Sequence, residues 1–127
     1  MRMSRTGRPM FSNEPAIRDD GACVVVTLRG ELDFANAADL RAVLSEAVAR
    51  NLHVVVDLSD LTFIDCVSLG VLVGARARAR EAGGDLVFAG ARGKVLRVIT
   101  LPCLAVVFPV YASVDEAARE RSDLYVS

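Results

Sequence analysis

Residues 54–73 read VVVDLSDLTFIDCVSLGVLV, and this stretch decides the fold. It begins as an apolar, β-branched run, passes through an acidic turn, and continues at once with apolar residues at helical spacing. A buried strand that leads into a helix through a polar turn is typical of an open α/β sheet, which places its sites at the carboxyl ends of strands. We therefore expect the function at the turn Asp65-Cys66-Val67-Ser68.

The rest of the chain alternates between strand and helix patterns. Apolar and β-branched runs predict strands at 22–28, 53–58, 85–89 and 106–110, with an extra strand near 11–18. Periodic apolar positions predict helices at 36–50, 66–81, 92–100 and 113–121, the first capped by Asn36 and the last by a Ser113–Glu116 capping box. Such alternation implies right-handed crossovers. The predicted fold is one α/β domain with a mostly parallel central sheet of four to five strands and about four helices.

Composition excludes several classes of protein. The 127 residues, 53% of them hydrophobic, suit one compact domain. A net charge of -1, from 15 basic and 16 acidic residues, argues against binding to nucleic acid and against polybasic docking on membranes. No apolar run approaches the ~20 residues of a membrane span. Three widely spaced cysteines indicate neither a disulfide framework nor a zinc site, so we expect a cytoplasmic protein.

The sequence supplies no catalytic constellation. Its only histidine, His53, opens a predicted strand, and no acidic residue lies within one turn of it. Asp57, Asp60 and Asp65 stand near one strand end, but a fourth oxygen donor in register is missing for a metal. We expect no enzyme activity, no cofactor and no metal.

Three segments carry a resemblance to a known family. GELDFANAADLRAVL at 30–44, the stretch 54–73, and the sequence from AGGDLVF at 82 onward together resemble a STAS domain of the anti-sigma factor antagonist type. The likeness extends over residues 11–121. It predicts a STAS domain there, between a disordered arm at 1–10 and a tail at 122–127.

The resemblance implies a function in partner switching. Proteins of this type bind an anti-sigma factor that is also a serine kinase with an ATPase-type fold, and they thereby free a sigma factor to direct transcription. Phosphorylation by that kinase breaks the complex. The partner and the signal are not specified by the sequence, and self-association stays open.

The acidic turn departs from the family pattern. The usual Asp-Ser-Ser-Gly-Leu falls on residues 65–69, where Asp65 and Leu69 match. The acceptor position is Val67, which has no hydroxyl to phosphorylate. Ser68 is a weak substitute, because one residue along a helix turns a side chain by about 100°; the alternative is that its hydroxyl bonds a first-turn backbone group. Cys66 is either an oxidisable thiol or a small apolar filler.

The resemblance also places the partner surface at this turn. Asp33 ends the family's Gly-Glu-Leu-Asp element and is expected to contact the partner, with a role at the start of the helix as the alternative. The expected partner-binding residues are Asp33, Asp65, Cys66, Val67, Ser68 and Leu69. The loss of the acceptor hydroxyl leaves a second hypothesis, a non-phosphorylated STAS subunit of a larger assembly such as a lipid-transport complex or a stress-signalling particle.

Overall fold

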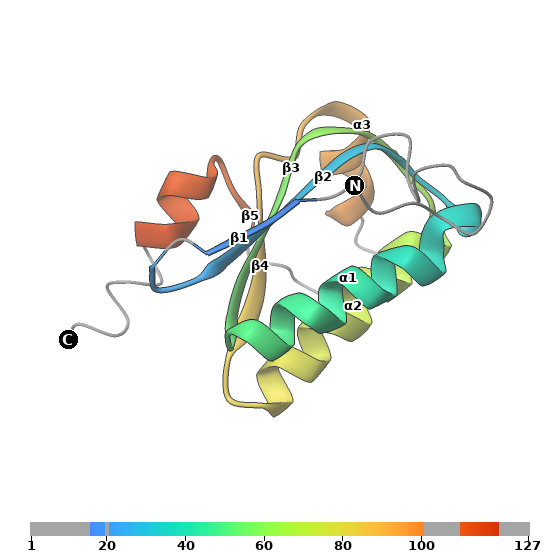
Figure 1. The fold of residues 1–127 in the computed structure, drawn as a ribbon. Coiled ribbons are helices and arrows are strands. Elements are labelled where there is room, and N and C mark those ends of the chain that lie inside the picture. Colours follow the sequence, from blue (N-terminus) through green and yellow to red (C-terminus); the bar gives the residue numbers. More distant parts are fainter. Residues whose placement is uncertain (1–15, 20, 101–109, 120–127) are drawn as a thin grey trace.

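One twisted sheet of five strands organises the molecule (Figure 1). The computed structural model describes residues 16–19, 21–100 and 110–119. Its strands lie in the order of the sequence, and β1 is antiparallel to β2 whereas the other neighbouring pairs are parallel. The strands are β1 (Ala16–Asp19), β2 (Val24–Leu32), β3 (His53–Ile64), β4 (Asp85–Ala89) and β5 (Val110–Tyr111). The predicted α/β fold with a mostly parallel sheet of four to five strands is thereby confirmed, with five strands in the described residues.

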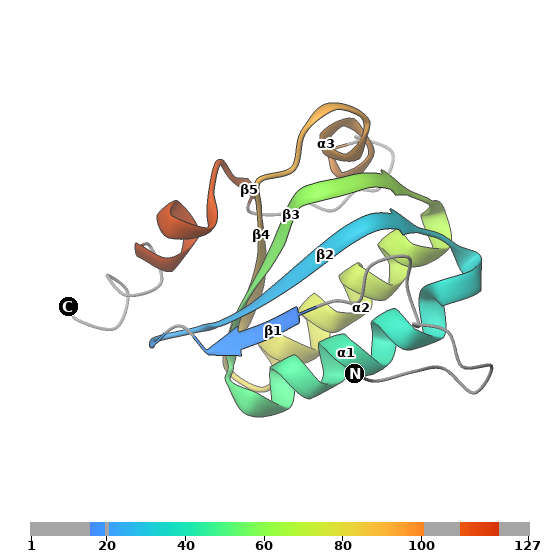
Figure 2. The same ribbon diagram turned by 45° about the horizontal axis from the view of Figure 1, so that its top comes forward.

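Helices cover both faces of the sheet, as in a layered α/β domain. The helices α1 (Ala37–Arg50) and α2 (Cys66–Glu81) lie side by side on one face, and helical residues 114–119 lie on the other (Figure 2). The short α3 (Gly93–Ile99) contacts β3, and a 3₁₀ turn, η1 (Phe34–Asn36), precedes α1. Apart from this 3₁₀ turn, the described residues contain four α-helical segments, which agrees with the predicted number.

The central strands are buried on both faces, as their continuous apolar runs predicted. Because successive strand residues point to opposite faces, Val24 and Val26 pack in the core under α1 and α2. Cys23 and Val25 pack instead with Ala117 on the opposite face. None of these five side chains is exposed, so the sheet has an apolar core on each of its two faces.

Two strands run farther than the sequence indicated. The strand predicted at 22–28 continues to Leu32, and the strand predicted at 53–58 continues to Ile64. Register shifts between Thr27 and Arg29 and between Gly30 and Glu31 interrupt this extension. Most of the predicted strand at 106–110 lies outside the described residues, as do the predicted arm at 1–10 and tail at 122–127.

The carboxyl end of α2 closes on two glycines. The Gly84 amide donates to the Ala79 carbonyl at 2.9 Å and the Gly83 amide to the Arg80 carbonyl at 3.1 Å, which is a Schellman motif. Gly83 has a φ of 96°, a value that favours glycine. A Cβ atom on Gly84 would overlap the carbonyl oxygen of Leu52. Both glycines are therefore required by the geometry of this end.

An ion pair fastens the same end of α2 to the sheet. The Nε of Arg76 lies 3.0 Å from the Oδ1 of Asp85, the first residue of β4. Only 12% of the arginine side chain and 18% of the aspartate side chain are exposed. At that degree of burial, loss of one partner leaves the other charge poorly solvated.

Candidate functional site

Asp65 is the organising residue of the turn before α2. It is the N-cap of the helix, and its Oδ1 accepts a hydrogen bond of 2.8 Å from the Ser68 amide. Its Oδ2 accepts a second bond of 2.8 Å from the Phe34 amide, which lies in the loop after β2. The Asp65 amide donates to the Leu32 carbonyl at 3.1 Å. One residue therefore joins two loops that are 31 positions apart in sequence.

These bonds hold Asp65 in its charged form. The hydrogen bond from the Ser68 amide is the largest influence on the pKa of Asp65, and together with the Ser68 side chain and the Phe34 amide it outweighs the opposing effect of burial. The pKa of Asp65 therefore lies below its ordinary value of 3.8. A permanent negative charge thus stands at the positive end of the α2 dipole.

Asp33 forms the start of η1 rather than a free surface carboxylate. Its Oδ1 accepts from the Ala35 amide at 3.0 Å, and its own amide donates to the Oδ1 of Asn36 at 3.0 Å. The alternative role of Asp33 at the start of the helix is therefore found. Asn36 occupies the N-cap position of α1 as predicted, but its side chain makes no cap bond to that helix and donates instead to the Glu31 carbonyl at 3.0 Å.

The first turn of α2 presents its residues in two directions. Cys66 is exposed and Val67 is 48% exposed, whereas Ser68 is completely buried and Leu69 is 3% exposed. This division agrees with the rotation of about 100° per residue in a helix. A kinase could reach Ser68 only after the turn had left the core.

The Ser68 hydroxyl lacks the backbone bond that was the alternative to phosphorylation. Its Oγ is buried and forms no hydrogen bond of standard geometry with the described residues, although the Ser68 side chain interacts with the Asp65 carboxylate and lowers the pKa of that group. A buried hydroxyl without a well-formed hydrogen bond costs free energy, because it has lost its bonds to water. Ser68 therefore fits this position imperfectly.

Sequence reasoning missed two aromatic residues beside the turn. Phe34 is 77% exposed and is bonded through its amide to Asp65, and Phe63 is 43% exposed two residues before that aspartate. With Val67 they are three of the exposed large apolar side chains of the described residues. An aromatic residue directly after the Asp33 cap was the available signal. Exposed aromatic side chains are typical of protein interfaces.

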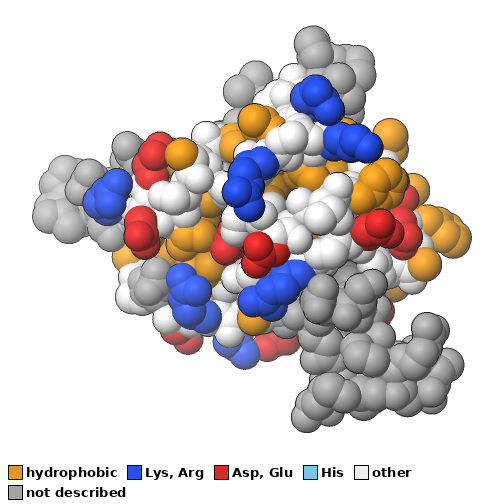
Figure 3. Space-filling model, turned by 90° about the horizontal axis from the view of Figure 1, so that it is seen from above, with side chains coloured by type: hydrophobic (Ala, Val, Ile, Leu, Met, Phe, Trp, Pro, Cys, Tyr) orange, Lys and Arg blue, Asp and Glu red, His pale blue; other side chains and the backbone are white. Residues whose placement is uncertain are grey.

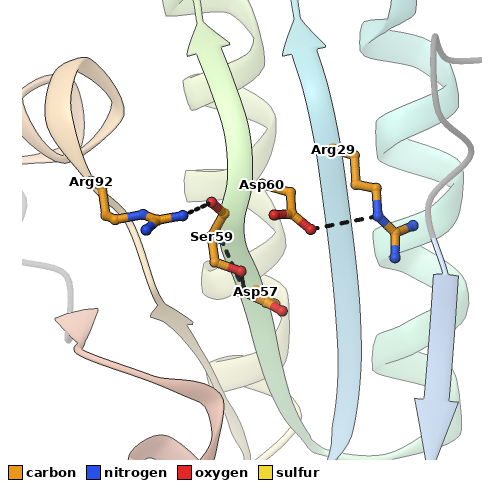
Figure 4. Close-up of polar contacts among 5 residues, drawn as sticks. All are labelled: Arg29, Asp57, Ser59, Asp60 and Arg92. Atoms are coloured by element: carbon orange, nitrogen blue, oxygen red, sulfur yellow. Dashed lines mark hydrogen bonds and ion pairs between the residues drawn. The ribbon is translucent and has the colours of Figure 1, made fainter.

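The two acidic residues within β3 do not join Asp65. The Oδ1 of Asp57 accepts from the Ser59 amide at 3.0 Å and from the Ser59 hydroxyl at 2.7 Å (Figure 4). Asp60 instead lies 3.7 Å from the Nε of Arg29 on β2. Each carboxylate has its own partner, and the part of the chain that the structure describes contains no group of three metal-ligating side chains.

Comparison with known proteins identifies the family of this fold. The STAS domain model matches residues 14–117. An anti-sigma F factor antagonist of Paenibacillus polymyxa is 29% identical over 76% of this chain and 85% of its own length. The anti-sigma-F factor antagonist RsfA of Mycobacterium tuberculosis is 28% identical over 80% of this chain and 81% of its own.

A solved structure supports the same relation. An anti-sigma factor antagonist from Mycobacterium paratuberculosis superimposes with a TM-score of 0.75 at 28% identity, covering 85% of this chain and 92% of the other. Within 16–19, 21–100 and 110–119, no helix has the length and apolar character needed to cross a bilayer.

Proposed function

This chain belongs to the STAS domain family, and on that premise we propose that it acts as an anti-sigma factor antagonist. In this proposal it binds an anti-sigma factor of the serine-kinase type, with an ATPase-type fold, and so releases a sigma factor in the cytoplasm. The names of its relatives support the proposal. Those relatives are regulators rather than enzymes, and we propose that this chain too acts by binding.

The exposed Val67 on a rigidly capped turn is the observation that carries the proposal. Its apolar side chain stands at the family's acceptor position and is 48% exposed. Asp65 fixes the turn below it through two backbone hydrogen bonds. The partner surface that we propose consists of Asp33, Asp65, Cys66, Val67, Ser68 and Leu69.

Residues of this surface would act in different ways. Cys66 and Val67 are exposed and would contact the partner directly. Asp33 and Asp65 would hold the two loops in position, since their carboxylates already accept backbone hydrogen bonds. The buried Ser68 and Leu69 would support the surface from below, in the manner of residues packed beneath an interface.

The proposal includes an altered switch. Val67 offers no oxygen to a kinase, and Ser68 is buried beneath it. The complex would therefore persist under conditions that dissociate a family member with serine at this position. Control would come through the partner or through another group, such as the exposed Cys66.

A phosphorylation assay tests the switch. We expect no phosphate at residues 65–69 of the unmodified chain after incubation with the kinase-type anti-sigma factor and ATP. The Val67→Ser variant restores an exposed hydroxyl and should take up about one phosphate per chain, located by mass spectrometry. The double variant Val67→Ser with Ser68→Ala is the matched control and should be modified equally. Stoichiometric phosphate on Ser68 of the unmodified chain would refute this part of the proposal.

A charge substitution tests the surface itself. Val67→Asp should weaken binding to the anti-sigma factor at least about tenfold, because it places an unpaired charge in an apolar contact. Leu52→Asp is the matched control: Leu52 is 43% exposed and lies directly before the opposite end of β3. Its affinity should be unchanged, with folding of both variants verified by circular dichroism. Equal affinities for both variants would remove the turn from the interface.

A second function remains in competition, because the missing hydroxyl at Val67 favours it as well. A STAS subunit of a larger assembly would need the fold and a docking surface but no phosphoacceptor. Capture of the native partner separates the two functions. Recovery of an ATPase-type kinase supports the antagonist, and recovery of a membrane transporter ATPase supports the subunit.

A further inference from the structure

A pocket lies at the carboxyl end of β3, between that strand and α3. Its volume is about 370 Å³. Two of its lining residues come from the end of β3 and three from α3: Phe63, Ile64, Lys94, Arg97 and Val98. Seen from above, the molecule shows hydrophobic side chains between scattered basic and acidic side chains (Figure 3).

The pocket has an almost wholly apolar lining, to which Lys94 and Arg97 contribute mainly the apolar stems of their side chains. Ile64 and Val98 are packed into the domain core or against it, and Phe63 is 43% exposed. Lys94 and Arg97 are exposed, and neither forms an ion pair with any residue that the structure describes. Within the same residues no carboxylate lines the pocket. Its positive charge is therefore not neutralised locally.

Size and chemistry indicate a class of ligand. Pockets of roughly 300–1,000 Å³ with apolar walls and a few charged groups are typical of small-molecule sites. An aliphatic chain would gain free energy by leaving water among Phe63, Ile64 and Val98. A carboxylate at its end would pair with Lys94 and with the planar guanidinium of Arg97, which suits a carboxylate in two parallel bonds.

We propose that this pocket binds an amphipathic anion, with a medium-length aliphatic chain in the pocket and its carboxylate at Lys94 and Arg97. A neutral chain would gain nothing from the two exposed cations, and a short carboxylate would leave the apolar walls in water. Both halves of the ligand are therefore needed. The pocket adjoins the turn through Phe63 and Ile64 but does not include Val67, so binding here would add a ligand input to a protein whose acceptor hydroxyl is absent.

Titration calorimetry on the full chain tests this ligand class. Octanoate should bind saturably at one site per chain. Butyrate retains the charge without the chain, and 1-octanol retains the chain without the charge, so each should bind at least about tenfold more weakly. Tight binding of 1-octanol, or no saturable binding of octanoate at millimolar concentration, would overturn the proposal.

Substitutions locate the binding. The double variant Lys94→Ala with Arg97→Ala should weaken octanoate binding about three- to tenfold, as expected for two exposed ion pairs. The charge-matched control, Arg41→Ala with Arg80→Ala, alters exposed positions on α1 and α2 and should bind as the unmodified chain does. Equal weakening in both variants would mean nonspecific attraction and would overturn the proposal.

The acyl chain has two sources, and competition distinguishes them. If phosphatidylglycerol vesicles displace octanoate, the pocket takes the acyl chain of an acidic lipid. If they do not, it takes the free acid, and either result supports the pocket. Failure of octanoate to bind would leave the proposed function intact, because partner binding is tested separately at Val67.

Discussion

Both ends of α2 are capped, the carboxyl end by backbone hydrogen bonds and the amino end by a side chain. At the carboxyl end, Gly83 and Gly84 close the helix on its own carbonyls. At the amino end, the cap is the charged side chain of Asp65, which also bonds the amide of Phe34 in another loop. The first end satisfies its own backbone, whereas the second depends on a distant segment.

The contrast extends to the side chains around each cap. Near the carboxyl end, Arg76 and Asp85 pair with little exposure, so this end contributes to stability. Near the amino end, Phe34 and Val67 are exposed, and the Ser68 hydroxyl is buried without a hydrogen bond of standard geometry to the described residues. Imperfect packing and exposed apolar groups are tolerated where a surface serves recognition. Substitutions at the two ends should therefore differ in kind as well as in size.

The largest effect is expected at Gly84. Gly84→Ala should lower the free energy of unfolding by about 3 kcal/mol, because its Cβ would overlap backbone atoms of Leu52 that cannot rotate away. Gly70→Ala is the matched control near the amino end of α2, where a new Cβ meets no atom within 4 Å. It should stabilise the helix by about 0.5–1 kcal/mol. Urea denaturation measures the free energy of unfolding of both variants. Similar values for the two would contradict the proposed difference between the ends of α2.

The ion pair at the carboxyl end should come next. Arg76→Ala leaves Asp85 poorly solvated and should cost about 2 kcal/mol in thermal or chemical unfolding. Arg78→Ala removes an exposed arginine from the same helix and should change stability by less than about 0.5 kcal/mol. If both variants unfold alike, the pair contributes no more than a surface contact.

Removal of the Asp65 cap should have a smaller effect that depends on pH. Asp65→Ala should cost about 1–2 kcal/mol at neutral pH, and Asp65→Ser, which keeps a capping oxygen, should cost less. The pKa of Asp65 is lowered in the folded protein, so its ionised form stabilises the fold above about pH 4. That stabilisation is lost as pH falls through the folded pKa. The stability difference between the original chain and Asp65→Ser should therefore shrink from pH ~5 to pH ~3, and a constant difference would contradict this origin.

The smallest effect, opposite in sign, is expected at Ser68. Ser68→Ala removes a buried hydroxyl that forms no hydrogen bond of standard geometry with the described residues and should raise the free energy of unfolding by about 1 kcal/mol. Thermal unfolding by calorimetry gives the sign directly. A loss of stability would show that the hydroxyl has a partner in solution and would weaken the contrast with the glycine cap.

The sequence predicted the parts of the fold in which local pattern and tertiary packing agree. The bounds of α2 and β4 match the prediction, since an apolar period, the Asp65 cap and the paired glycines all indicate the same ends. The extension of β2 to Leu32 and of β3 to Ile64 was missed. Polar residues such as Arg29 and Asp60 interrupt the apolar pattern there, and the two strands support each other through pairing that no single strand reveals.

The directions of the side chains in the first turn of α2 were predictable from the sequence, but their contacts were not. The sequence correctly predicted that the side chains of Val67 and Ser68 point in different directions, because consecutive positions of a helix are rotated by about 100°. The bond from the Phe34 amide to Asp65 depends on the register of β2 against β3, which brings the two following loops together. The exposure of Phe34 arises from that same loop arrangement, so it could not be inferred from a local pattern.

The double bonding of Asp65 changes how the turn should be interpreted in sequences of this kind. An aspartate at this position is required to begin a helix and to hold the loop that carries Phe34, whether or not the chain is ever phosphorylated. The presence of this aspartate therefore reflects the architecture of the turn, and only the residue two places later bears on the proposed loss of phosphorylation. A sequence comparison that weights both positions equally would therefore assign a phosphorylation switch to chains that keep the aspartate but lack the serine.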